Sequence, residues 1–320
     1  MATFPCEKDL FYLARKYVFY ERIFTGTNVV VYKARDKRRR IVAIKLVQGL
    51  NEGYEEYEWP QTEPKEVRMA RQCKHKNVVE FLKFYPFPES DSYALVTRYY
   101  NNKNVENDDI KKYIKDLLSA TEYLHSIGII HRDIKPDNYI WTGKKGVLLD
   151  FDCAAYYRPI NGHYSYTGTD GFIAPEVRDC DDEIDTDDDE DVEHEEYVED
   201  ECSENEEEYD ENEEEEEEED DDEADAEEED AEEEDEPRRK KGYDYKVDSY
   251  SIGIILGMKL CKFKVAEIED GDKDESHILE KLNTKHYKSN GAYDLVYGLL
   301  EYDPQDRLSP TEALKSKYFM

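Results

Sequence analysis

A single acidic block limits how this chain of 320 residues can fold. The stretch Asp181–Glu236 holds 42 of the 81 acidic residues and contains no lysine or arginine. It has almost no branched or aromatic side chains, so it cannot bury enough apolar surface to offset the entropy lost on folding. We therefore expect residues 178–241 to be a disordered acidic insertion within a folded unit that the flanking residues build.

The rest of the chain has a different character. The 264 residues outside the block carry 39 acidic and 43 basic side chains, although the whole chain has a net charge of −38. A chain of this size can bury a sizeable core. The six cysteines show no C-x-x-C pair and no metal-binding spacing with histidine, which favours free thiols in a reducing compartment.

Apolar segments of the kind that export and membrane insertion require are missing from the sequence. Residues Met1–Leu10 have no apolar core of the signal-peptide kind, and no run of about 18 apolar residues occurs. We expect an intracellular protein, in the nucleus or the cytoplasm, with no membrane partner and no direct nucleic-acid partner. The basic run Arg238–Lys241 fits either a nuclear-import signal or a local counter-charge to the acidic block.

Periodicity predicts a β-rich part followed by a helical part. Short β-branched and aromatic runs predict five strands, namely Tyr17–Tyr20, Val29–Tyr32, Ile41–Val47, Val78–Phe84 and Tyr93–Tyr99. A helix is expected between the third and fourth strands. Apolar residues at three- and four-residue steps predict a further helix over residues 110–124, capped by Asn107 or Asp108. Ser309–Glu312 predicts a capping box near the C-terminus.

One short segment after that helix, Ile130–Asn138, gathers three chemically distinct polar groups. Asp133, Lys135 and Asn138 place a carboxylate, an ammonium and a carboxamide at fixed offsets. Phosphoryl transfer from ATP to a hydroxyl requires such a trio, because the carboxylate takes the proton, the ammonium screens charge and the amide holds magnesium. The segment resembles the catalytic loop of eukaryotic-type protein kinases.

Other motifs of that family follow in the family's order. They are Val42–Lys45, Glu66 ahead of His75–Val79, Asp150–Asp152 in place of D-F-G, Gly168–Glu176 at the end of an activation segment, Asp248–Gly253, and Arg307 after Asp303-Pro304. The resemblance spans residues 17 to 319. It implies an α+β, two-lobed protein kinase fold with a small lobe over residues 17–98, a mainly helical large lobe over 99–320 and an N-terminal extension over 1–16.

The resemblance also implies a reaction and its cofactors. The γ-phosphate of ATP would pass to serine or threonine hydroxyls of proteins, with Mg²⁺ as the second cofactor. Asp133 would be the catalytic base, with Lys135 and Asn138 beside it, while Asn138 and Asp150 would bind the metal. Lys135 together with Thr169 resembles serine/threonine enzymes rather than tyrosine enzymes.

Nucleotide binding would involve residues of the small lobe above all. Lys45 would contact the α and β phosphates, and a lysine on a buried strand needs a carboxylate partner. Glu66 takes that place in the family pattern, and Glu63 is the alternative. The other residues that resemble nucleotide-contacting positions are Ile23, Gly26, Val31, Ala43, Thr97 and Ile140.

Two departures from the family pattern leave a second function open. The glycine-rich loop keeps only its middle glycine, Gly26, because Phe24 and Val29 occupy the outer positions. Glycines let backbone N–H groups approach phosphates, so the cradle should be poorer here. Asp152 stands where the family has glycine. The alternative function is a pseudokinase scaffold that recruits basic partners through its acidic insertion.

The sequence leaves several alternatives open for regulation and for the subfamily. The acidic block is an inert solubilising loop, a docking site for a basic partner or regulatory subunit, or an autoinhibitor that folds back on Arg35–Arg40 or on the active-site face. Arg132 resembles the arginine that binds a phosphorylated activation segment, and the candidate acceptors are Tyr164, Ser165, Tyr166 and Thr167. The sequence is similar to the cell-division-cycle-seven type of kinase, which suggests cell-cycle or replication control. A divergent parasite or virus-encoded kinase fits equally well.

Overall fold

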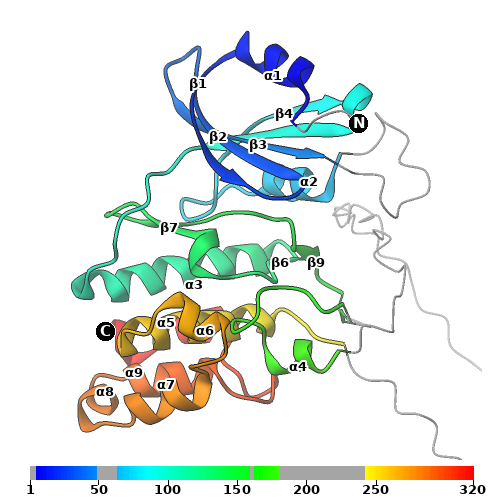
Figure 1. Cartoon of the computed structure of the whole chain (residues 1–320). Helices are drawn as coiled ribbons and strands as arrows, with labels where there is room; N and C mark the ends of the chain where they lie inside the picture. Colours follow the sequence, from blue (N-terminus) through cyan, green and yellow to red (C-terminus); the bar gives the residue numbers. More distant parts are fainter. Residues whose placement is uncertain (1–4, 49–62, 159–161, 164, 181–241) are drawn as a thin grey trace, which may run out of the picture. The chain divides into compact units, whose positions relative to one another are not determined.

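The computed structural model describes residues 5–48, 63–158, 162–163, 165–180 and 242–320 (Figure 1). The described residues form one compact unit. The acidic block, the run Arg238–Lys241 and Tyr164 lie outside the described residues, so the predictions made for them stay predictions.

The N-terminal part is a five-stranded antiparallel sheet with one helix on each face. The strand order is β1-β2-β3-β5-β4. The strands are β1 (Tyr17–Thr25), β2 (Val29–Asp36), β3 (Ile41–Gln48), β4 (Phe81–Phe87) and β5 (Ser92–Arg98), and the helices are α1 (Glu7–Ala14) and α2 (Lys65–Gln72). Leu13 of α1 packs with Ile44 and Val96, whereas Val67 of α2 packs with Leu95. The five predicted strands are therefore confirmed.

The fourth strand begins three residues later than predicted. Val78 and Val79 were expected to open it, but they pair with Leu148 instead. The Val79 amide donates to the Leu148 carbonyl at 2.9 Å, and the Leu148 amide donates to the Asn77 carbonyl at 2.8 Å. This apolar run thus pairs with a distant segment and does not open β4, because buried amides need hydrogen-bond partners wherever they lie.

Successive side chains of β3 face opposite sides of the sheet, and one of these sides carries residues of the candidate site. Val42, Ile44 and Leu46 of β3 are fully buried against the α1 side. Ala43 and Lys45 therefore point to the α2 side, because successive side chains of a strand face opposite ways.

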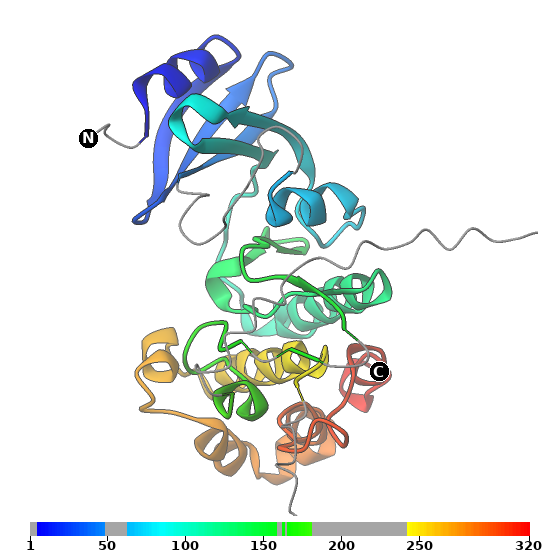
Figure 2. The same cartoon turned by 90° about the vertical axis from the view of Figure 1, so that its right-hand side faces the viewer.

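The large lobe is built around one almost completely buried helix, α5 (Lys246–Cys261). It packs against α3 (Ile110–Ser126), α7 (Glu275–Leu282) and α9 (Ala292–Leu299), as Figures 1 and 2 show. The shorter helices are α4 (Pro175–Arg178), α6 (Val265–Glu269), α8 (Lys285–Ser289) and α10 (Pro310–Ala313), with 3-10 turns η1 (Pro88–Ser90), η2 (Asn107–Asp109), η3 (Pro136–Asn138) and η4 (Lys317–Phe319). Two small sheets pair β6 (Ile129–Ile130) with β9 (Ala155–Tyr156) and β7 (Tyr139–Trp141) with β8 (Gly146–Leu148).

The predicted helix over residues 110–124 is confirmed, but its predicted cap is wrong. Asn107 and Asp108 lie in the turn η2, and α3 begins at Ile110 with Asp109 at the N-cap position, whose side chain makes no cap hydrogen bond. The extra turn moves both predicted caps away from the helix start. The capping box is confirmed, since Ser309 accepts from the Glu312 amide and the Glu312 carboxylate accepts from the Ser309 amide.

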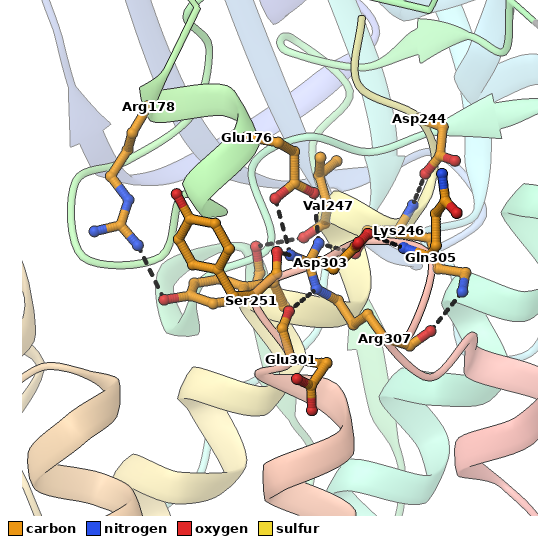
Figure 3. A network of polar contacts seen from close by, with 12 residues as sticks. Glu176, Arg178, Asp244, Lys246, Val247, Ser251, Glu301, Asp303, Gln305 and Arg307 are labelled. Carbon is orange, nitrogen blue, oxygen red and sulfur yellow. Dashed lines mark hydrogen bonds and ion pairs between the residues drawn. The ribbon is translucent and has the colours of Figure 1, made fainter. Parts of the chain in front are cut away.

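A buried ion pair joins the end of the activation segment (Asp150–Glu176) to the C-terminal part. Arg307 has 1% of its surface exposed, and its guanidinium donates to Glu176, with Nη2 2.8 Å from Oε2 (Figure 3). Its remaining donors go to the carbonyls of Glu301, Tyr302 and Lys246. Because every nitrogen of the guanidinium is satisfied, the arginine tolerates burial.

Five cysteines fall within the described residues, and all five are free thiols, as predicted. Cys202 lies outside the described residues. Burial raises the pKa of the Cys73 thiol to about 12 and that of the Cys261 thiol to about 11. A thiol with such a pKa is less than about 0.1% thiolate at pH 8, against roughly a quarter for an ordinary cysteine.

We therefore expect iodoacetamide at pH 8 to alkylate Cys73 and Cys261 at least about 100-fold more slowly in the native protein than in guanidinium chloride. Peptide mass spectrometry over a time course measures both rates in one sample. Equal native and denatured rates would show that these thiols are accessible in the folded protein.

Candidate active site

A buried carboxylate organises the loop between β6 and β7. Asp248 of α5 is fully buried and accepts hydrogen bonds from the amides of His131 and Arg132 at 2.9 and 2.8 Å. It also contacts Nε2 of His125 at 2.8 Å. Burial alone raises the pKa of the Asp248 carboxyl, but the hydrogen bond from His125 and the nearby imidazoles outweigh it, so the pKa lies below its usual value. The ionised carboxylate thus supports Arg132 in a left-handed conformation at φ 64°.

Four polar side chains, three from this loop and one from the activation segment, contact one another. The Thr169 hydroxyl donates to Oδ1 of Asp133 at 2.7 Å, and Nζ of Lys135 donates to the Thr169 hydroxyl at 2.5 Å. Nζ of Lys135 also lies 3.0 Å from Oδ2 of Asp133, and Nδ2 of Asn138 donates to that same oxygen at 2.8 Å. The residues predicted as the catalytic trio are therefore in mutual contact. Asp133 accepts from several donors and is suited to orient an incoming hydroxyl.

Lys45 is surrounded by three carboxylates. Its Nζ lies 2.8 Å from Oε1 of Glu66, 2.7 Å from Oδ1 of Asp150 and 2.5 Å from Oδ1 of Asp152. The alternative partner, Glu63, pairs with Arg71 instead. The ion pair of Lys45 with Glu66 thus brings β3 and α2 together.

The charges around Lys45 follow from burial and mutual attraction. Burial lowers the pKa of the Lys45 ammonium, but the carboxylates of Glu66, Asp150 and Asp152 more than compensate, and the pKa is raised. Burial raises the pKa of Glu66 well above its usual value, and the neighbouring Asp152 and Asp150 add to this. Burial opposes ionisation of Asp150 as well, yet Lys45 holds its pKa below the usual range. Lys45 is therefore firmly cationic.

The residues predicted to contact the nucleotide lie mainly on the α2 side of the sheet. Val31 is in register with Lys45, and Ala43 is in register with Thr97, all four half-buried. Ile140 lies half-buried on β7. Ile23 on β1 is 44% exposed.

Gly26 forms a tight turn between β1 and β2. Its amide donates to the Val29 carbonyl at 2.8 Å, and a Cβ at this position would meet Val29 Cγ1 at 2.9 Å. Phe24, at the first lost glycine position, is 55% exposed. A side chain at position 26 would therefore crowd Val29, so the turn depends on the one glycine that the loop keeps.

The carboxylates near Lys45 also fit a divalent metal. Ligand oxygens of Glu66, Asp150 and Asp152 all lie within 4.8 Å of one another. Asn138, the other predicted ligand, lies next to this segment through its main chain, because the Leu149 amide donates to its main-chain carbonyl at 2.8 Å, whereas its side-chain Nδ2 donates to Asp133. Hard oxygen donors with a net negative charge suit Mg²⁺. The sequence reasoning treated Asp152 only as a backbone departure and missed that its side chain reaches Lys45.

We expect Asp152→Gly to strengthen ATP binding by about 1.4- to fivefold, since a half-exposed ion pair is worth about 0.2–1 kcal/mol and Asp152 competes with phosphate for Lys45. A fluorescent ATP analogue titrated with and without Mg²⁺ measures the effect. Asp152→Asn, which removes the charge and keeps the size, should behave alike. Weaker binding in the presence of Mg²⁺ would contradict this and show that Asp152 helps to hold the metal.

The sequence of this chain is similar to those of known proteins. The family description of the protein kinase domain matches residues 17–189 and 236–319. A probable serine/threonine-protein kinase, fhkB of Dictyostelium discoideum, is 27% identical over 95% of this chain and 23% of its own length. Serine/threonine-protein kinase 1 of Arabidopsis thaliana is 35% identical over 51% of this chain and 20% of its own length.

A third relative covers a shorter region. A probable casein kinase II subunit alpha homolog of Encephalitozoon cuniculi is 31% identical over 45% of each chain. This chain therefore spans a quarter or less of the first two relatives and about half of the third. These relatives carry different kinase names. With the fold, the loop held by Asp248 and the contacts of Lys45 in agreement with a family match over most of the sequence, the chain belongs to the protein kinase family.

Proposed function

We propose that this protein transfers the γ-phosphate of ATP to serine or threonine hydroxyls of proteins. The observation that carries the proposal is the contact of Asp133 with Thr169, Lys135 and Asn138. A group that accepts from so many donors keeps a fixed orientation, which general base catalysis requires. The names of the relatives in Dictyostelium and Arabidopsis agree with serine/threonine specificity.

Two groups of residues would have separate roles, one toward the substrate hydroxyl and one toward ATP and the metal. ATP with Mg²⁺ supplies the phosphoryl group when bound. Asp133 would orient the substrate hydroxyl and accept its proton, and Lys135 would screen negative charge beside it. On the other side Lys45, fixed by Glu66, would hold phosphate oxygens, while Asp150 and Asn138 would hold the metal.

The contact between Lys135 and Thr169 supports serine or threonine as the acceptor. The two side chains are 2.5 Å apart and both reach Asp133. This pair resembles the lysine and threonine of serine/threonine enzymes rather than the residues of tyrosine enzymes.

The test is transfer of labelled phosphate from ATP, with and without Mg²⁺, to one basic and one acidic model protein. Phosphoamino-acid analysis of the product identifies the acceptor. We expect label on serine or threonine, dependent on Mg²⁺ and absent with Asp133→Asn. Label on tyrosine would overturn the specificity. If ATP binds but neither model protein is phosphorylated, the result would favour the pseudokinase scaffold that the tight Gly26 turn suggests.

Partners, location and pathway belong to the same proposal. We expect protein substrates and a basic partner for the acidic block, whose binding should weaken steeply with salt. Deleting Asp181–Glu236 should then abolish that binding, and unchanged activity of the deletion variant on a basic peptide would rule out autoinhibition. Among the described residues, no helix is long and apolar enough to cross a membrane. An intracellular location and a role in cell-cycle or replication control stay predictions.

A further inference from the structure

The first residues described after the acidic block are joined to the activation segment. Tyr243 and His163 form an antiparallel bridge, with both N–H···O distances at 2.9 Å. Both side chains are buried at 3% exposure. His163 also contacts the Tyr156 carbonyl of β9 through Nε2 at 3.0 Å. Residues on opposite sides of the block in sequence are thus neighbours in the fold.

Close approach of two glycines makes this bridge possible. Gly162 has φ +66°, and a Cβ there would lie 2.6 Å from the carbonyl carbon of Gly242. No side chain fits at that distance without a backbone shift. The bridge between Tyr243 and His163 therefore depends on glycine at position 162.

The Tyr243 hydroxyl extends the contact toward the catalytic loop. It donates to the Ser165 carbonyl at 2.8 Å, and Nη1 of Arg132 donates to it at 3.2 Å. The same Nη1 donates to the Ser165 hydroxyl at 3.1 Å, while Nε of Arg132 donates to the Cys153 carbonyl at 2.6 Å. Tyr243 thereby links Arg132, which precedes the proposed base, to the middle of the activation segment.

We propose that Tyr243 is a positioning residue that clamps the activation segment against Arg132. Its backbone holds His163, and its hydroxyl holds Ser165 and Arg132. Thr169, four residues beyond Ser165, bonds Asp133, so the clamp sets the side of the site that receives the substrate hydroxyl. The contacts of Lys45 are not part of this clamp. The clamp works through unmodified side chains, and its role in catalysis rests on the proposed function.

The test compares two variants with two matched controls, all treated with phosphatase beforehand. Tyr243→Phe removes only the hydroxyl, and Tyr245→Phe is its control. Gly162→Ala adds the Cβ that meets Gly242. Gly271→Ala is its control, because Gly271 also has positive φ, +74°, but no atom within 4 Å of the added carbon.

Hydrogen exchange of the His163 and Tyr243 amides, which bond to each other's carbonyls, is the first readout. We expect exchange to become about 2- to 12-fold faster in Tyr243→Phe, as loss of one hydrogen bond implies, and faster still in Gly162→Ala. The KM for a protein substrate should rise by a similar factor, whereas the KM for ATP should stay constant. Neither control should differ from the unmodified protein.

Two results are decisive. If Tyr243→Phe matches Tyr245→Phe in both exchange and protein-substrate KM, the clamp is refuted. If no variant, including the unmodified protein, transfers phosphate, the proposed function fails, but the exchange contrast between Tyr243→Phe and Tyr245→Phe still decides whether Tyr243 clamps the segment.

Discussion

Asp133→Asn should lower the rate of phosphate transfer by about 10²- to 10⁴-fold, the usual contribution of a positioned general base. The substitution keeps the shape of the side chain and one acceptor oxygen, so Thr169 or Asn138 can still bond to it. It removes the negative charge that accepts the proton and that pairs with Lys135. Initial rates at saturating ATP measure the loss.

Folding and nucleotide binding should be unaffected by that change, because the nucleotide-binding Lys45 contacts other carboxylates. We expect ATP affinity within about twofold and Tm within about 2 °C of the unmodified protein, as for most conservative changes at partly exposed positions. Asp137→Asn is the matched control, since Asp137 is exposed in the same loop. An Asp133→Asn enzyme as fast as Asp137→Asn would exclude Asp133 as the base.

Arg307→Met should destabilise the fold by about 3–5 kcal/mol, the range for removing one partner of a buried ion pair. Glu176 would be left beside apolar surface without its guanidinium, and the carbonyls of Glu301 and Tyr302 would lose their donor. For a domain of this size the loss corresponds to a Tm lower by roughly 6–20 °C. Urea unfolding followed by circular dichroism gives the free energy of unfolding.

A surface pair provides the comparison. Arg98 and Glu80 form an ion pair with nearly half of each side chain exposed, so Arg98→Met should cost less than about 1 kcal/mol. The double variant Arg307→Met with Glu176→Gln should recover part of the loss, because no buried charge is then left unpaired. Similar costs for Arg307→Met and Arg98→Met would show that the Glu176 contact contributes little to stability.

Sequence patterns alone predicted the parts of this protein that depend on neighbours along the chain. β2 and β3 alternate with period two, α3 has a continuous apolar stripe, and the capping box at Ser309 needs only four residues. The trio of Asp133, Lys135 and Asn138 lies within one short loop, so its spacing already places the groups together. Such features are local, and local propensity and periodicity determine them.

Tertiary structure decided the features that join distant segments. Only the folded chain shows that Asp152 reaches Lys45, 107 positions away. The predicted start of β4 was wrong because the Val79 amide donates to the Leu148 carbonyl. The bridge of Tyr243 to His163 joins residues on opposite sides of the acidic block in sequence. Many residues along the chain offer the same charge or the same apolar side chain. Packing and the need to satisfy buried polar groups select one partner among them, and a one-dimensional pattern does not contain that choice.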